Sequence, residues 1–230
     1  LKLKKPKLVP EQDTATSMNN LAAAYQAASR LDQALPLFEE ALKLRAKLGP
    51  DAPRTLASMY NLADAYQAAS KLDQALPLFE EALKLRKVKL GPEHPHTLKS
   101  MSGLGLAYLA AGKPSESEQA VRECLGIYKT KSPDNWRTFS TRSLLGGSLL
   151  AQKKYADAEP LLLSGYEGMQ QREGKIPALE RRQLAEALRR LVRLYEAQGR
   201  ADRAGEWCLK LLAFEQPQPG QPGAKSAPQP

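Results

Sequence analysis

Residues 20–45 read NLAAAYQAASRLDQALPLFEEALKLR, and residues 61–86 repeat them almost unchanged as NLADAYQAASKLDQALPLFEEALKLR. The two stretches differ only where Ala23 gives way to Asp64 and Arg30 to Lys71. A repeat with a period of 41–42 residues indicates a stack of equivalent units, each of which buries its apolar face against its neighbours. Stacks of this kind present surfaces to partners, so the sequence predicts binding rather than catalysis.

The same skeleton extends over five repeats. In the first half of each repeat, Leu62-x3-Tyr66 becomes Leu104-x3-Tyr108, then Leu145-x3-Leu149, then Leu191-x3-Tyr195. The second half carries a small, a large and a small residue at fixed spacing, in chain order Ala34, Phe38, Ala41; Ala75, Phe79, Ala82; Ser117, Val121, Cys124; Ala158, Leu162, Gly165; and Ala204, Cys208, Leu211. About four extra residues, around 174–180, separate the fourth repeat from the fifth.

Apolar residues recur at helical spacing in both halves of each repeat, which predicts two helices per repeat. In the second repeat, Pro77 is tolerated only in a first helical turn, so the second helix is expected to begin near Asp73. The dipeptide Gly91-Pro92 is expected to end that helix, and Thr97 to cap the next one.

This pattern resembles the tetratricopeptide repeat (TPR) over residues 15–214, with the signature positions matched in the second repeat by Leu62, Ala63, Tyr66, Ala75, Phe79 and Ala82. The resemblance implies an all-α fold, a right-handed α-solenoid of antiparallel helix hairpins. The period and the connector GPEHPHT at 91–97 resemble the longer repeats of kinesin light chains and many bacterial proteins. Residues 143–169 and 184–207 are similar to the C-terminal repeats of large bacterial multidomain Ser/Thr kinases.

The expected repeats run over residues 15–54, 55–96, 97–137, 138–180 and 181–214. Residues 1–10, LKLKKPKLVP, align with LKLRKVKLGP at 83–92, so residues 1–14 are interpreted as the tail of a preceding, truncated repeat plus a connector. We therefore expect a fragment of a longer protein in which residues 1–8, including Leu1, Leu3 and Leu8, are loosely held. Residues 215–230 are rich in Pro, Gly and Gln and are expected to be disordered. The last repeat has no capping helix after it, so Leu209, Leu212 and Phe214 are expected to form an apolar edge.

The composition indicates a cytoplasmic protein without a membrane span or signal peptide. The net charge is +9, from 34 Lys and Arg against 25 Asp and Glu. Nucleic-acid binding would need basic residues interleaved with free aromatic rings, whereas the tyrosines here occupy expected core positions. The charge therefore fits either an acidic partner or a solvated surface.

No residue pattern predicts an enzyme, a cofactor or a metal. The two histidines, His94 and His96, share one connector and do not make a closed metal site. No nucleophile elbow or phosphate-binding loop occurs. Cys124 and Cys208 lie at expected core positions and are interpreted as buried hydrophobic residues. A catalytic kinase domain could still precede the repeats in a parent chain.

In the TPR architecture the first helices line a concave groove. The residues that alignment places there as candidates for binding a peptide are Asn19, Asn20, Gln26, Tyr60, Asn61, Asp64, Gln67, Lys99, Ser102, Leu106, Arg189 and Arg193. Some TPR proteins hold a C-terminal carboxylate with two asparagines and three basic residues. Asn20, Asn61 and Lys99 resemble three of those five positions, while Thr16 and Gly103 stand where the other two need positive charge.

The resulting hypothesis is a scaffold that binds an extended protein segment with apolar anchors and some acidity, as the recruiting region of a multidomain kinase or on its own. Asn20 and Asn61 have a second interpretation, in which they cap or bridge neighbouring helices. The alternative function is a spacer or a self-association module without a peptide ligand, which the near-identity of the first two repeats favours.

Overall fold

The structure is a computed structural model that describes residues 11–216. The expectations for residues 1–10 and for the tail from 217 onward, including Leu1, Leu3 and Leu8, lie outside this range. The described residues contain ten α-helices, two short 3-10 helices and no strand. The α-helices are α1 (Glu11–Ala27), α2 (Leu31–Leu48), α3 (Pro53–Ala68), α4 (Leu72–Leu90), α5 (Pro95–Ala110), α6 (Pro114–Lys131), α7 (Trp136–Ala151), α8 (Tyr155–Gln170), α9 (Arg182–Ala197) and α10 (Ala201–Glu215).

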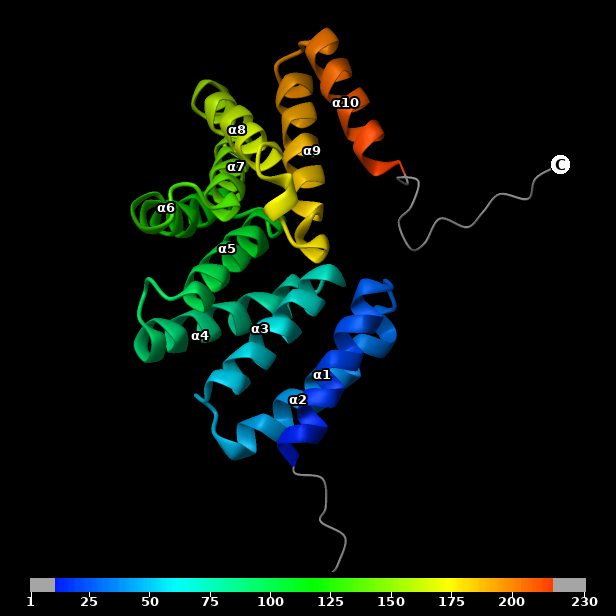
Figure 1. Ribbon diagram of the computed structural model, residues 1–230, viewed down its shortest axis with the longest axis vertical. Helices are drawn as coiled ribbons and strands as arrows, with labels where there is room; N and C mark the ends of the chain where they lie inside the picture. The colour runs from blue at the N-terminus through cyan, green and yellow to red at the C-terminus, as the bar shows by residue number, and fades with distance from the viewer. Residues whose placement is uncertain (1–10, 217–230) are drawn as a thin grey trace, which may run out of the picture. The chain divides into compact units, whose positions relative to one another are not determined.

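The chain forms two compact bodies, and the boundary between them falls inside α6, after Cys124. The N-terminal body contains α1 to α5 with the first part of α6 (Figure 1). The C-terminal body contains the rest of α6, α7 to α10, and two 3-10 helices, η1 (Glu173–Lys175) and η2 (Ala178–Glu180). The 3-10 helices lie where the sequence has its additional residues before the fifth repeat.

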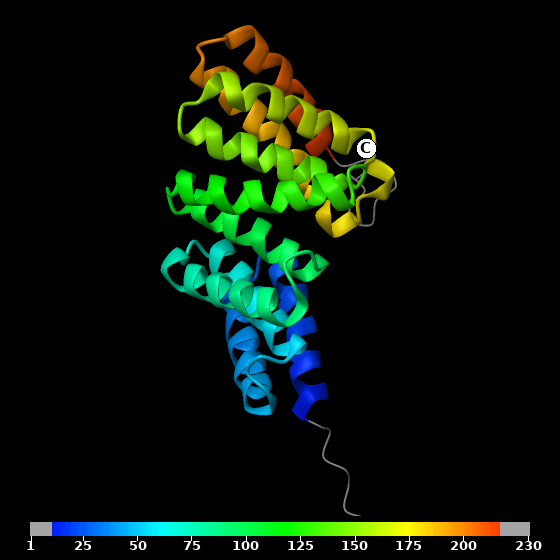
Figure 2. The same ribbon diagram turned by 90° about the vertical axis from the view of Figure 1, so that its left-hand side faces the viewer.

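Within each body, successive helices pair as hairpins. Helix α1 packs on α2, α3 on α4, α7 on α8 and α9 on α10; Figure 2 shows the α7–α8 pair side by side. The second helix of one repeat also packs on the first helix of the next, as α2 does on α3 and α4 on α5. The expected two-helix repeat is therefore confirmed.

All five hairpins turn in the same way. The residue at the turn has positive φ in each case: Ser29, Ser70, Gly112, Lys153 and Gly199, with φ between 58° and 70°. The next residue donates its backbone N–H to the carbonyl five residues earlier, for example Lys71 to Tyr66 at 2.9 Å. This is the Schellman end of a helix, in which a left-handed residue lets the orphan carbonyls find donors. Glycine adopts this conformation without penalty, whereas a side chain there costs about 1–2 kcal/mol.

The small positions of the repeat let helices approach closely. Ala34, Ala75, Ser117 and Ala158 are all fully buried, and Ala204 is buried. In the C-terminal body, a Cβ added to Gly165, the second small position of the fourth repeat, would lie 2.7 Å from the backbone nitrogen of Ser143. The close packing at such positions explains why the repeat keeps small residues there.

Two expectations about the helices differ from the structure. Helix α4 begins at Leu72, which places Pro77 in the second turn, where its exposed ring costs the helix one hydrogen bond. His94 caps α5 and Pro95 opens it, while Thr97 lies inside the helix and its buried hydroxyl donates to the carbonyl of Gly91 at 2.8 Å. Thr97 therefore braces the connector instead of capping the helix.

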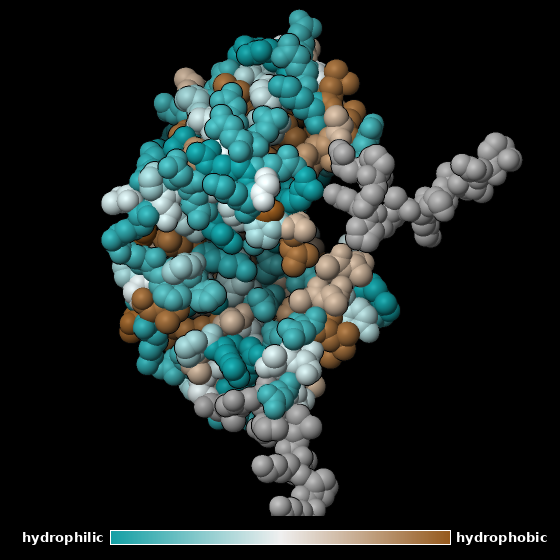
Figure 3. Space-filling view, in the orientation of Figure 1, coloured by the Kyte–Doolittle hydropathy of each residue, from teal (hydrophilic) through white to brown (hydrophobic). Residues whose placement is uncertain are grey.

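The two cysteines differ in their burial. Cys124 is buried as expected, but Cys208 is exposed, because within the described residues no helix follows α10 to cover that face. Leu209 and Leu212 are exposed beside Cys208, by 69% and 53%, and Phe214 is half-buried. Figure 3 shows hydrophobic atoms at the surface of α10. The expected apolar edge is present on this helix.

Candidate functional site

The first helices of the N-terminal body, α1, α3 and α5, form one continuous row, since α3 contacts both α1 and α5. We call their outward residues the first-helix face. These residues are exposed or half-buried and consist of Asn20, Ala23, Gln26, Tyr60, Asn61, Asp64, Gln67, Lys99, Ser102 and Leu106.

A buried arginine fixes α1 and α3 relative to α2. Arg45 of α2 is 8% exposed, and its guanidinium donates to the hydroxyls of Ser58 at 2.8 Å and Thr16 at 3.1 Å and to the carbonyl of Arg54 at 2.9 Å. Burial lowers the pKa of Arg45, and the charge of Arg54 lowers it further. Because a buried charge must be hydrogen-bonded, these contacts hold the three helices in one register.

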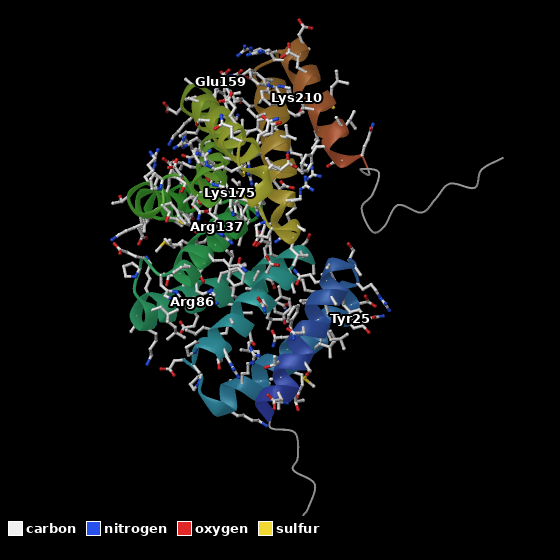
Figure 4. The ribbon with its side chains drawn as sticks, in the orientation of Figure 1. Tyr25, Arg86, Arg137, Glu159, Lys175 and Lys210 are labelled. Carbon is white, nitrogen blue, oxygen red and sulfur yellow. The ribbon has the colours of Figure 1, made fainter. Side chains whose placement is uncertain are left out.

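Arg86 of α4, labelled in Figure 4, does the same one repeat later. It is 3% exposed and donates to the hydroxyl of Ser100 at 2.6 Å and to the carbonyls of His96 and Leu56, both at 3.0 Å. Desolvation lowers the pKa of Arg86, and the nearby Tyr60 acts in the opposite direction. Arg86 thus ties α4 to both α3 and α5.

The asparagines of the candidate site have different surroundings. Asn19 is only 6% exposed and its amide donates to the carbonyl of Ala15 and to the hydroxyl of Ser58, both at 3.0 Å. Asn19 therefore does not face a ligand, contrary to the sequence alignment, because it supports the same serine that Arg45 binds. Asn61 is half-buried and its amide donates to Oδ1 of Asn19 at 3.4 Å. Asn20 is exposed, and no hydrogen bond joins its side chain to another of the described residues.

Gln26 and Asp64 bridge two first helices. The Gln26 amide donates to Oδ2 of Asp64 at 2.7 Å, and both side chains are half-buried. Asp64 is one of the two positions at which the near-identical repeats differ, since its equivalent in the first repeat is Ala23. The substituted residue therefore forms a contact between the two repeats. Gln67, the equivalent of Gln26, is half-buried on α3.

Positive charge gathers around the Tyr60 ring. The ammonium of Lys99 lies 4.9 Å from the ring centroid and the guanidinium of Arg86 lies 5.3 Å from it, both suited to cation–π attraction. The ring stands edge-on to Phe79, and a Cβ on Gly103 would lie 2.9 Å from Cε2 of Tyr60. A side chain at position 103 would therefore require the Tyr60 ring to shift.

The same positive charge acts on His96. Desolvation lowers its pKa, and the charges of Arg86, His94 and Lys99 lower it further. Beside these groups, Ser102 is half-buried and lies 3.4 Å from the Cys124 sulfur, and Leu106 is half-buried and apolar. The α5 end of the first-helix face is thus basic and partly apolar, while α1 and α3 contribute mostly amides.

The two arginines predicted in the fifth repeat belong to the C-terminal body. Arg189 forms ion pairs with Glu186 and with Glu215 of α10, and Arg193 is exposed. In the fourth repeat, Ser143 and Gly147 of the first helix α7 are buried. Ser143 accepts a hydrogen bond from the buried Arg190 at 3.3 Å.

Sequence reasoning missed the buried arginines and a set of tyrosine–glutamate bonds. A tyrosine of one repeat's first helix donates to a glutamate of the preceding second helix: Tyr66 to Glu39 at 2.7 Å, Tyr108 to Glu80 at 2.8 Å and Tyr195 to Glu159 at 2.9 Å. Glu39 and Glu80 are themselves exposed, so these two bonds lie at the surface. Arg, Ser, Tyr and Glu recur at the same positions of successive repeats, and this recurrence could have pointed to the hydrogen bonds. Recurrence alone, however, does not distinguish buried polar pairs from solvated surface residues.

No other chemistry gathers in the described part of the chain. Residues 11–216 contain no cluster of three or more His, Cys, Asp or Glu side chains that could hold a metal ion. In the same range, no helix combines the length and the apolar character that a bilayer crossing needs.

The family model for the tetratricopeptide repeat matches residues 13–87 and 66–130, which together span just over half of the chain. The chain belongs to the tetratricopeptide repeat family. No sequence among the curated proteins matches it. Repeats of this family serve as protein–protein interaction scaffolds and are typically non-catalytic.

Solved structures agree with the family. A putative kinesin light chain from Podosopora anserina, with nearly identical TPR-like repeats, is 26% identical, with a TM-score of 0.68 over 90% of this chain and 97% of that one. BtubC (BKLC) from P. vanneervenii is 17% identical, with a TM-score of 0.67 over 96% of this chain and 89% of that one. RapI in its apo form is 14% identical, with a TM-score of 0.66 over 91% and 86%. The fold is therefore an all-α repeat solenoid, and its likeness to kinesin-light-chain-type repeats is confirmed.

Proposed function

We propose that the first-helix face binds an extended segment of a protein partner. The observation that carries this proposal is the pair Asn20 and Asn61, equivalent residues on adjacent helices, the first exposed and the second half-exposed. An asparagine amide can donate and accept at the same time, which suits the backbone of an extended peptide. Successive asparagines on neighbouring repeats would hold such a backbone at two points.

The neighbouring residues favour a partner with some acidity and with apolar anchors. Lys99 is exposed next to the Tyr60 ring, and the guanidinium of the buried Arg86 lies 5.3 Å from the centroid of the same ring. An acidic side chain of the partner would pair with Lys99, and an apolar one would pack on Leu106. Of the two arginines predicted to take part from the C-terminal body, Arg193 is exposed, whereas Arg189 is already paired with Glu186 and Glu215.

The buried arginine network supports the proposal because it fixes the binding residues before a partner arrives. Arg45 and Arg86 hold the three first helices at defined positions through hydrogen bonds to buried groups. A preorganised surface loses less conformational entropy on binding. The Asn61–Asn19 bond is long, at 3.4 Å, so Asn61 could exchange it for a ligand at small cost.

A role as the recruiting region of a multidomain Ser/Thr kinase rests on sequence resemblance in residues 143–169 and 184–207 alone. The second candidate function is self-association or spacing. The exposed Leu209 and Leu212 of α10 favour it, since exposed apolar clusters mark interaction surfaces. Light scattering over a range of concentrations separates the two: a mass that rises with concentration supports self-association.

The binding proposal is tested with peptides selected from a random display library on the full chain. For a selected peptide, the double variant Asn20→Ala/Asn61→Ala should bind roughly 30-fold more weakly, because two lost hydrogen-bonding side chains amount to about 2 kcal/mol. The control is Gln119→Ala, an exposed amide on α6, which should leave affinity unchanged. Full affinity in a correctly folded double variant would refute the proposed site.

A further inference from the structure

The connector between α4 and α5 caps its helix with a histidine. His94 is the residue immediately before α5, and its Nδ1 accepts the backbone N–H of His96 at 3.2 Å. A ring nitrogen can accept a hydrogen bond only while it carries no proton. The capping bond of α5 therefore exists only while Nδ1 of His94 is unprotonated.

The equivalent connectors carry different residues at the capping position. The connectors before α3, α5 and α7 end with Ala52, His94 and Asn135. Ala52 makes no side-chain cap, whereas the amide oxygen of Asn135 accepts the backbone N–H of Arg137 at 3.0 Å and does not titrate. Of these three helices, only α5 has a cap that responds to pH. The chain contains two histidines, so both belong to this connector.

The charges that act on the two imidazoles are positive. The His94 and His96 rings lie 5.3 Å apart, centroid to centroid. Desolvation lowers the pKa of His96, and the charges of Arg86 from α4, of His94 and of Lys99 from α5 lower it further. A second proton on either ring therefore brings like charges together.

Carboxylates of the neighbouring segments have other partners. Asp51, in the connector before α3, pairs with Lys89 of α4 at 2.6 Å. Glu123 of α6 pairs with Lys87 of α4 at 2.8 Å. Glu93, next to His94 in the connector, is exposed and leaves the pKa of His96 lowered. The positive charge around the histidines is therefore not neutralised by these acids.

We propose that the α4–α5 connector is a pH-sensitive switch, closed by the His94–His96 bond and opened when acid protonates both imidazoles. Protonation removes the acceptor of the capping bond and adds positive charge beside Arg86 and Lys99, so the first turn of α5 frays. The carbonyl of His96, which accepts from the buried Arg86 at 3.0 Å, moves with this turn. Because Lys99 lies three residues after His96, the switch acts at the α5 end of the first-helix face.

Acid opens the connector because the folded chain holds the proton of His96 less strongly than the unfolded chain does. Its pKa in the folded chain is lowered from the ordinary 6.5, so the unfolded chain takes up the proton first as pH falls. The contribution to stability is fully present above about pH 6.5 and is lost as pH falls below that value. Histidine is the side chain that ordinarily changes charge between about pH 5 and pH 8.

Amide hydrogen exchange followed by NMR on the full chain tests the switch at about pH 7.5 and about pH 5.5. The probe is the amide of Leu98, which donates to the carbonyl of His94 at 3.0 Å, and the control is the equivalent amide of Leu56, which donates to Ala52 at 3.0 Å. After correction for intrinsic exchange, the protection of Leu98 relative to Leu56 should fall about fivefold at the lower pH, the factor that a helix cap of typical strength supplies. An unchanged ratio would overturn the proposal.

The double variant His94→Asn/His96→Gln assigns the effect to the histidines. Its asparagine supplies an acceptor that does not titrate, as Asn135 does before α7, and the variant contains no histidine. The ratio of protection should then be the same at both pH values, and the same fall as in the parent chain would overturn the proposal. The measurement uses no ligand, so its outcome does not depend on the proposed function.

Discussion

The replacement Arg86→Met should destabilise the N-terminal body by about 2–4 kcal/mol. The methionine keeps most of the buried volume but removes the donors to Ser100 and to the carbonyls of Leu56 and His96. A buried polar group left without a partner costs about 1–3 kcal/mol, and two carbonyls lose their donor here. Relief of the buried charge, whose desolvation lowers the pKa of Arg86, offsets part of that cost.

Arg45 gives an internal comparison, because it holds the equivalent place in the first repeat. It donates to one backbone carbonyl and two hydroxyls, and its Nε is buried without a partner among the described residues. The replacement Arg45→Met should therefore cost less, about 1–2 kcal/mol. Arg122, exposed on α6 with an ion pair to Glu118, is the control, and Arg122→Met should cost at most about 1 kcal/mol.

Urea unfolding followed by far-ultraviolet circular dichroism measures the free energy of unfolding for all three variants. The expected order of cost is Arg86, then Arg45, then Arg122. A cost below about 1 kcal/mol for Arg86→Met, or a larger cost for Arg45→Met, would refute the reasoning that Arg86 ties three helices together.

Three further predictions concern single positions. Gly168→Ala should destabilise the C-terminal body by about 3 kcal/mol, because the added Cβ would overlap Phe139. The control Gly126→Ala, in an open part of α6, should stabilise the folded protein by about 0.5–1 kcal/mol. Comparable urea midpoints for the two variants would contradict the packing. Ser70→Gly, at a φ of 58°, removes a left-handed strain of about 1–2 kcal/mol. The greater freedom of glycine in the unfolded chain offsets about 0.4–1 kcal/mol of this gain. The net stability in the same assay should therefore rise by about 0.5 kcal/mol, and a loss would contradict the turn geometry. The pKa of Tyr66 is raised to about 12 by burial and by a hydrogen bond to a carboxylate. Between pH 10 and pH 12 the unfolded chain loses this proton while the folded chain keeps it, so stability should fall as pH rises; Tyr66→Phe should show a shallower fall, and an unchanged slope would contradict the assignment.

Much of the fold could be predicted from the sequence because the repeat is so nearly identical. The spacing of Leu62, Tyr66, Ala75 and Phe79 fixes which faces are apolar, and the period fixes how hairpins stack. Errors arose where local rules were applied without tertiary context. Thr97 has the chemistry of a helix cap, but Pro95 opens the helix, so the cap falls on His94, three residues earlier.

The candidate site was less predictable. Alignment placed Asn19 on the binding face, and only the structure shows that its amide is used to support Ser58. Arg45 and Arg86 turn inward to buried groups, and a sequence cannot show which long side chains turn inward. Cys208 was expected in the core because its equivalents are buried, and it is exposed because α10 ends the described stack.

The most direct test of the account is amide chemical-shift mapping by NMR on the full chain with a library-selected peptide. Binding at the first-helix face predicts the largest shifts at Asn20, Asn61 and Lys99 and in their turns of α1, α3 and α5, with small shifts in α2 and α4. Shifts confined to the second helices or to α10 would place the binding surface elsewhere and contradict the central claim.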